Sequence, residues 1–148
     1  MKILFDTNVL VAGFLNRGTC REVISIASII HQVYYTDFII TELQNVLKNK
    51  FNIPEFLIKG FTTLIKKYFN MAETAPVVHH VCRDGSDDQI LADALFNEMD
   101  LVVTGDTDIL ELKTYQGIKI ISPREFFIPS LTKAYFGRKS VPFKAKNG

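Results

Sequence analysis

Short apolar runs alternate with longer segments of helical periodicity along the 148-residue chain. The apolar runs, rich in β-branched and large aliphatic residues, predict strands at 2–5, 33–36, 77–81, 101–104 and 118–121, with a turn at 113–117. Apolar positions three or four residues apart predict helices over about 19–31, 37–50, 54–71 and 86–97. Strands that alternate with helices and are apolar throughout are typical of parallel sheets. The pattern therefore predicts an α/β fold around a central parallel sheet, with helices on both faces.

Polar residues at the expected helix ends predict where three of these helices begin. Thr19 and Glu22 form a capping-box pattern ahead of one apolar segment, and Ser86 and Gln89 form a second. Asp37 is placed to cap the helix that follows the second strand.

Composition and charge limit the class of protein. The chain is 47% hydrophobic and 22% charged, which is typical of a globular domain. We expect one domain over 1–128 and a basic tail over 129–148, which would serve as a flexible arm, an RNA contact or a partner-binding strip. The last 16 residues contain no acid and five basic side chains, namely Lys133, Arg138, Lys139, Lys144 and Lys146. The net charge of only +1 argues against a protein that coats nucleic acid.

The expected location is the cytoplasm. Cys20 and Cys82 lack a CxxC or zinc-binding pattern, which suits a reducing compartment. Asp6 interrupts the apolar start of the chain and no small-residue cleavage site follows, so we expect no signal peptide. No uncharged apolar run approaches the roughly 18 residues of a membrane span.

Carboxylates follow two of the predicted strands. Asp6 comes directly after the first strand, and Asp106 and Asp108 come after the strand at 101–104. In parallel α/β sheets, sites lie beyond the carboxyl ends of the strands. These three acids are therefore expected to open on the same edge of the sheet.

Two helices bring further acids. Asp87 and Asp88 lie in the first turn of the helix at 86–97, and Asp88 shares a stripe with Leu91 and Leu95, so it is expected to lean toward the packed side.

In the same helix, Asp93 points away from that stripe and is expected to be solvated. Glu42 lies beside the apolar face of its own helix, about 100° from its centre.

So many carboxylates in one place require a cation or raised pKa values. Two unit charges about 4 Å apart repel by roughly 4 kcal/mol at an effective dielectric near 20. Oxygen ligands without His or Cys select hard cations, meaning Mg²⁺ or Mn²⁺. Such a cation can activate a water and stabilise charge on a phosphate, so the cluster predicts phosphoryl chemistry.

Each acid also has a purely structural interpretation. Asp106 could be only the N-cap of a short helix, with Asp108 a favourable first-turn acid. Asp87 and Asp88 are equally suited to a first turn, and Glu42 to an exposed helix surface. Asp6 is harder to explain in this way, because no capping role is evident for it from the sequence. The joint placement of the acids favours a site.

Five stretches in order resemble the PIN-domain nucleases, including the VapC-like toxins of bacterial toxin–antitoxin pairs. They are FDTNVLVAG (5–13), TELQNVL (41–47), RDGSDDQILADAL (83–95), VVTGDTDILEL (102–112) and ISPREFF (121–127). The resemblance implies a three-layer α/β/α domain that cleaves single-stranded or structured RNA with Mg²⁺ or Mn²⁺. It also implies an antitoxin protein as a possible partner and a homodimer, for which the apolar helix at 54–71 could supply a surface.

Roles for single residues are carried over from the same family motifs. The acidic quartet corresponds to Asp6, Glu42, Asp88 and Asp106. Asp108 corresponds to a further metal ligand, and the supporting residues are Asn8, Thr104 and Asp87. Phosphate contacts are expected from the basic residues Arg83, Lys113 and Arg124.

Two other functions compete with a ribonuclease. A HAD-type phosphatase would share an acid at the end of the first strand, but it needs a second acid where this chain has Asn8, and a phosphate-binding lysine motif that is not evident. A non-catalytic PIN domain would only bind RNA or protein. An acidic cluster without a metal would oppose RNA binding, which counts against the second alternative.

Overall fold

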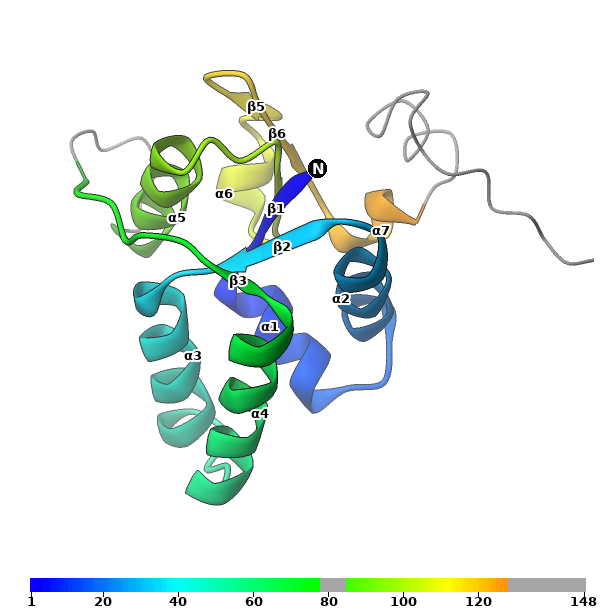
Figure 1. Ribbon diagram of the computed structural model, residues 1–148, viewed down its shortest axis with the longest axis vertical. Coiled ribbons are helices and arrows are strands. Elements are labelled where there is room, and N and C mark those ends of the chain that lie inside the picture. The colour runs from blue at the N-terminus through cyan, green and yellow to red at the C-terminus, as the bar shows by residue number, and fades with distance from the viewer. Residues whose placement is uncertain (78–84, 128–148) are drawn as a thin grey trace, which may run out of the picture.

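The computed structural model describes residues 1–77 and 85–127 (Figure 1). Their elements are, in order, β1 (Lys2–Phe5), α1 (Thr7–Leu15), α2 (Thr19–Ile30), β2 (Gln32–Tyr35), α3 (Asp37–Asn49), α4 (Glu55–Tyr68), β3 (Asn70–Met71), α5 (Gly85–Phe96), β4 (Leu101–Val103), α6 (Thr107–Leu110), β5 (Thr114–Tyr115), β6 (Ile118–Ile121) and α7 (Pro123–Phe126). The tail at 129–148 and all of the predicted strand at 77–81 except Val77 lie outside the described residues. None of the described helices is long and apolar enough to cross a membrane.

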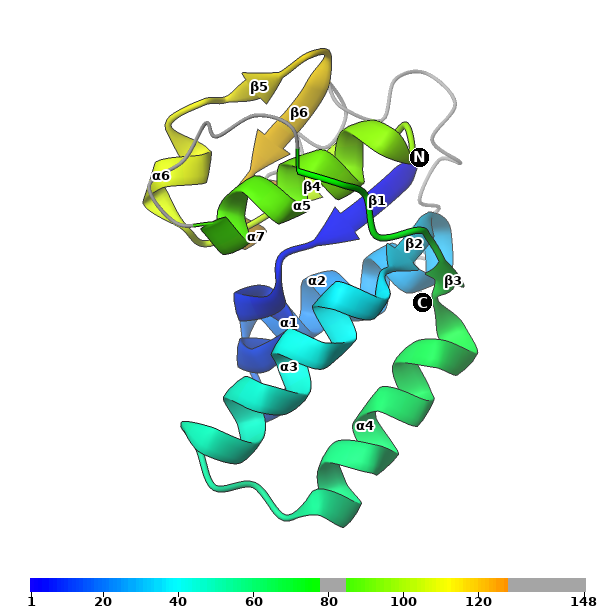
Figure 2. The same ribbon diagram turned by 90° about the vertical axis from the view of Figure 1, so that its left-hand side faces the viewer.

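The six strands of the described residues form one sheet in the order β3-β2-β1-β4-β6-β5. All neighbours are parallel except β5 and β6. The chain first moves outward from β1 to β3 and then returns to β4 on the other side of β1. Because parallel crossovers are right-handed, this reversal places α5 on the opposite face of the sheet from α1 and α3, as Figure 2 shows. The predicted three-layer α/β/α fold is confirmed.

The central strands β1 and β4 determine where the candidate site lies in the sheet. Residues 3–5 of β1 and 101–103 of β4 are at most 1% exposed, because helices cover both faces of the sheet. The register pairs Phe5 with Val103 and Val103 with Ile121. Strands β1, β4 and β6 therefore end together, and β1 and β4 flank the point where the strand order reverses, which is where α/β sheets place their ligands.

Helix α1 follows β1 after a single residue and was not predicted. Its buried residues include Val9, Leu10 and Val11, and it has no polar face that would reveal a helical period. A Cβ atom on Gly13 would lie 2.5 Å from Cδ1 of Ile24, so a larger residue there would require the end of the Ile24 side chain to move. The early helix places the residue after β1 at a helix N-terminus.

Two of the predicted helix caps are wrong by one residue. Helix α2 is preceded by Gly18 and has no side-chain cap, and Thr19 is its first residue. Helix α3 is capped by Thr36, whose Oγ1 accepts a hydrogen bond of 3.3 Å from the backbone N–H of Ile39. Asp37 is the first helical residue, where a negative charge still suits the helix dipole.

The predicted turn at 113–117 is a hairpin. Strand β5 pairs with β6 in antiparallel fashion, and the connecting residues Gln116 and Gly117 have φ values of 46° and 87°. Two consecutive residues with positive φ are typical of a type I′ turn, which suits the right-handed twist of the strands.

Asp93 of α5 is buried, and its predicted exposure to solvent is wrong. Its side chain is 0% exposed and accepts hydrogen bonds from Thr36 Oγ1 (3.1 Å), Ala75 N (2.7 Å) and Gln89 Nε2 (2.8 Å). Burial raises the pKa of this carboxyl, and the three donors lower it. Gln89 Nε2 also donates to Ala75 O at 2.6 Å. Helix α5 begins at Gly85, and the predicted Ser86–Gln89 capping box depends on the Ser86 side chain, which lies outside the part of the chain that the structure describes. Asp93 thus joins α5 to the start of α3.

Replacing Asp93 by alanine should lower the free energy of unfolding by about 2–4 kcal/mol, because three buried donors would lose their acceptor. For a chain of this length the melting temperature should fall by roughly 10 °C. Asp93→Asn is the matched control, since its amide oxygen can still accept hydrogen bonds from Ala75 and Gln89. A calorimetric melting temperature of Asp93→Ala within about 2 °C of the wild type would instead support a solvated Asp93.

Candidate metal centre

A hydroxyl group links the acids at the ends of β1 and β4. Asp6 is 6% exposed, and Thr104 is 0% exposed. Thr104 Oγ1 donates a hydrogen bond of 2.7 Å to Asp6 Oδ2 and accepts one of 3.0 Å from the backbone N–H of Asp106. The Asp6 backbone N–H donates in turn to Val103 O at 2.9 Å. The Asp6 carboxylate is therefore held in place relative to the start of the loop after β4.

Asp6 occupies the N-cap position of α1, but its side chain makes no cap hydrogen bond. Burial raises the pKa of its carboxyl to about 6, against the lowering effect of the Thr104 hydrogen bond. The nearby carboxylates of Glu42 and Asp106 raise this pKa further. Glu42 is half-buried on α3 and so belongs to the same electrostatic environment. A cation at this place would relieve the cost of ionising Asp6.

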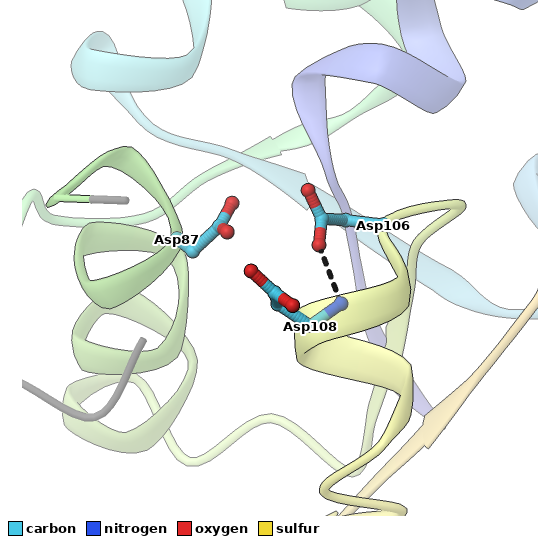
Figure 3. A group of neighbouring side chains, drawn as sticks. All are labelled: Asp87, Asp106 and Asp108. Carbon is cyan, nitrogen blue, oxygen red and sulfur yellow. Dashed lines mark hydrogen bonds between the residues drawn. The ribbon is translucent and has the colours of Figure 1, made fainter. Parts of the chain in front are cut away.

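Two further carboxylates converge on that of Asp106 beside this pair of strands. Asp87, Asp106 and Asp108 each place one carboxylate oxygen within 4.8 Å of the others. Figure 3 shows Asp87 reaching from α5 toward Asp106 and Asp108 at the start of α6. Asp106 Oδ1 also accepts a hydrogen bond of 2.8 Å from the Asp108 backbone N–H, which makes Asp106 the N-cap of α6. Asp106 therefore caps α6 and is at the same time one of the three converging acids.

Asp87 faces this cluster because of the way α5 packs. The buried residues Ile90 and Ala94 lie three and seven positions after Asp87, so all three share one face of the helix. The expected lean of Asp88 toward the packed side is confirmed, because Leu91, three positions later on the same stripe, is 1% exposed. Asp88 is itself buried at 3% exposure but is not one of the three converging acids. The apolar stripe through Ile90 and Ala94 is a sequence signal for the burial of Asp87 as well as Asp88.

The other expected site residues lie on the surface or outside the described ranges. Asn8 is exposed in the first turn of α1. Lys113, with a φ of 58°, follows α6 and is exposed, as is Arg124 in α7. Arg83 lies outside the described residues. Phosphate contacts by these three basic residues stay predictions.

The converging side chains fit a hard divalent cation. Their donors are carboxylate oxygens, and Mg²⁺ and Mn²⁺ prefer such ligands. The three donors come from two elements, α5 and the segment from Asp106 to Asp108, and Asp6 and Glu42 add charge nearby. The fold and the cluster together define an α/β domain with an acidic centre at the reversal point of its sheet.

The sequence profile of the PIN domain matches residues 2–108, which is more than half of the chain. The protein belongs to the PIN-domain family, whose nucleases are hydrolases that act on nucleic acids. No curated protein matches the chain in sequence.

Two solved structures share the fold. VapBC2 from Rickettsia felis, bound to a DNA fragment from its promoter, is similar with a TM-score of 0.62 and 13% identity, over 82% of this chain and 98% of that one. The PIN domain endonuclease Utp24 is similar with a TM-score of 0.50 and 18% identity, over 82% of this chain and 84% of that one. At these identities the likeness supports the fold alone.

Proposed function

We propose that the protein is an endoribonuclease that depends on Mg²⁺ or Mn²⁺. The observation that carries this proposal is the convergence of Asp87, Asp106 and Asp108 within 4.8 Å, next to the buried carboxyl of Asp6. Membership of the PIN-domain family supports the nuclease class and leaves no support for the phosphatase alternative. RNA as the substrate rests on the resemblance of the five sequence stretches to PIN-domain ribonucleases.

The cation would be held by Asp87, Asp106 and Asp108, with Asp6 as a further ligand or close neighbour. When bound, it would activate a water for attack on the phosphodiester and stabilise the charge that develops on the phosphate. Asp88 stays a candidate ligand from the sequence motif.

Side chains of the chain itself would supply orientation and proton transfer. Thr104 holds the Asp6 carboxylate through a 2.7 Å hydrogen bond, which keeps one oxygen of Asp6 in a fixed direction. Glu42 is half-buried near Asp6 and would position the attacking water or accept its proton. The backbone N–H of Asp108 holds one oxygen of Asp106 and leaves the other for the cation or the substrate.

A role as the toxin of a toxin–antitoxin pair is the more specific form of this proposal. An antitoxin protein as partner rests on the resemblance of the five sequence stretches to VapC-like toxins, and VapBC2, which shares the fold, is such a toxin–antitoxin pair. Exposed apolar side chains on α4, among them Phe56 and Leu64, suit a protein partner or a second copy of the chain. A homodimer and a cytoplasmic location stay predictions.

The proposed function predicts cleavage that depends on the cation. Purified protein should cut 5′-labelled single-stranded RNA with Mg²⁺ or Mn²⁺, and EDTA should reduce the rate to background. Returning excess Mn²⁺ should restore it, which excludes irreversible loss of the fold as the cause. Cleavage that persists in EDTA would contradict a metal-dependent site. Metal-independent RNA binding without cleavage would support the non-catalytic alternative.

A further inference from the structure

The outer face of α3 carries an open hollow of about 580 Å³ next to the acidic centre. Its polar lining comes from Thr41, Glu42, Asn45, Asn49 and Lys50. The half-buried side chains of Phe38 and Val46 supply its apolar part. We call the lining residues from Thr41 to Lys50, together with Phe51, the α3 surface.

The α3 surface begins at the proposed catalytic site. Glu42 lines the hollow and is also one of the acids that raise the pKa of Asp6. Asn49 lies seven residues further along the helix, which is about 10 Å at 1.5 Å per residue. Figure 2 shows α3 starting beside β2 and running away from the sheet toward the loop before α4. A polymer bound across the acids can therefore continue along this helix.

The chemistry of the α3 surface changes along this direction. After Glu42, the polar residues that line the hollow are two asparagines and one lysine, with no further acid. At its far end the Lys50 ammonium lies 5.7 Å from the ring centroid of Phe51, a residue that is 41% exposed. The far end of the α3 surface therefore combines a positive charge, from Lys50, with a partly exposed aromatic ring, from Phe51.

This combination suits a single-stranded nucleic acid better than a protein. Lysine binds phosphate, carboxamides can hydrogen-bond base edges, and an exposed aromatic ring stacks on any base. The acids near the reacting phosphate repel the neighbouring phosphates, so these need cationic or neutral partners a short distance away. The α3 surface offers such partners, and its length matches about two or three nucleotides.

We propose that the α3 surface holds the RNA strand next to the scissile phosphate, with Lys50 on a phosphate and Phe51 under a base. This inference rests on the proposed nuclease function. The residues concerned bind substrate and hold no metal, so they should affect substrate affinity and leave the rate of the saturated enzyme unchanged.

The test is single-turnover cleavage of a labelled 12-nucleotide single strand over a range of protein concentrations with saturating Mn²⁺. Lys50→Ala and Phe51→Ala should each raise the half-saturating protein concentration by about 10-fold, as expected when one phosphate contact or one stacked base is lost. Their saturated rates should stay within about 2-fold of the wild type. Lys50→Ala should also reduce the salt dependence of binding by about 0.7 in the log–log slope, as expected for one phosphate contact on a single strand.

Lys66→Ala is the matched control. Lys66 is an exposed lysine on α4, and its substitution removes the same charge as Lys50→Ala. It should leave the half-saturating concentration unchanged. The α3 inference fails, with the nuclease function intact, if the wild type cuts RNA and both α3 variants resemble the Lys66 control. It also fails if the variants lower the saturated rate or the Mn²⁺ affinity alone. If the wild type cuts no RNA, the proposed function and this inference fall together.

Discussion

Asp6→Asn is expected to abolish cleavage while raising the melting temperature of the metal-free protein. The activity should fall by more than the roughly 10–100-fold that follows loss of an outer partner of a metal site. The opposite effect on stability arises because Asp6 is buried beside Glu42 and Asp106, and its ionised form is costly at neutral pH. Asparagine keeps an oxygen that can accept the Thr104 hydrogen bond but carries no charge.

The size of the gain follows from the pKa of Asp6. Raising it from 3.8 to about 6 corresponds to about 3 kcal/mol of lost stability once the group is ionised in both folded and unfolded chains. Below the lower value both forms are protonated and the cost disappears. The metal-free wild type should therefore gain stability relative to Asp6→Asn as the pH falls from about 7 to about 4.

Thermal melts in EDTA at several pH values measure this difference. At pH 7 the variant should melt a few degrees higher, by at most about 10 °C, and the gap should close near pH 4. Burial lowers the pKa of His31 to about 4, so the protonation of this side chain on unfolding destabilises the folded protein as the pH falls over the same range. The effect is equal in the wild type and in Asp6→Asn, so it does not change the difference between their melting temperatures.

Asp37→Asn removes an exposed acid at the start of α3 and serves as the control for Asp6→Asn, with little change in either activity or this pH trend. A variant of Asp6 that melts lower and still cuts RNA would make Asp6 a structural residue.

The strand ends could be predicted from the sequence because short-range patterns specify them. The apolar runs of β1 and β4 are continuous, since both faces of these strands are buried. The acids that follow them, Asp6 and Asp106, are thereby placed at the carboxyl edge of the sheet by the sequence pattern alone. The hydroxyl of Thr104 was also expected to support the acids, and it lies between them.

The environment of α5 could not be predicted in the same way. Asp93 is buried because the segment at Ala75 and the N-cap of α3 both donate hydrogen bonds to it, and these contacts join residues far apart in the sequence. The rotation of α5 follows from the same packing. The stripe through Leu91 and the family motif indicated Asp88, and both aspartates are buried, but Asp87 is the one that converges with Asp106 and Asp108.

The neighbouring substitutions Asp87→Asn and Asp88→Asn separate these two assignments. Asp87 is one of three carboxylates within 4.8 Å, so its loss should weaken Mn²⁺ binding by at least roughly 10–100-fold and reduce cleavage similarly. Excess Mn²⁺ at about 100 times its dissociation constant should stabilise the wild type by about 2.7 kcal/mol, and most of this should vanish in Asp87→Asn. Asp88→Asn should keep most of the Mn²⁺ affinity.

Calorimetric titration of Mn²⁺ into the two variants makes the comparison, and each is the control for the other because the same chemical change is made one residue apart. If Asp88→Asn alone loses Mn²⁺, the cation is held by Asp88 and not by Asp87, as the sequence motif predicts. If Asp87→Asn alone loses Mn²⁺, the approach of Asp87 to Asp106 and Asp108 determines the ligand. The three-acid cluster at the start of α6 is then the metal site, because Asp87 faces it.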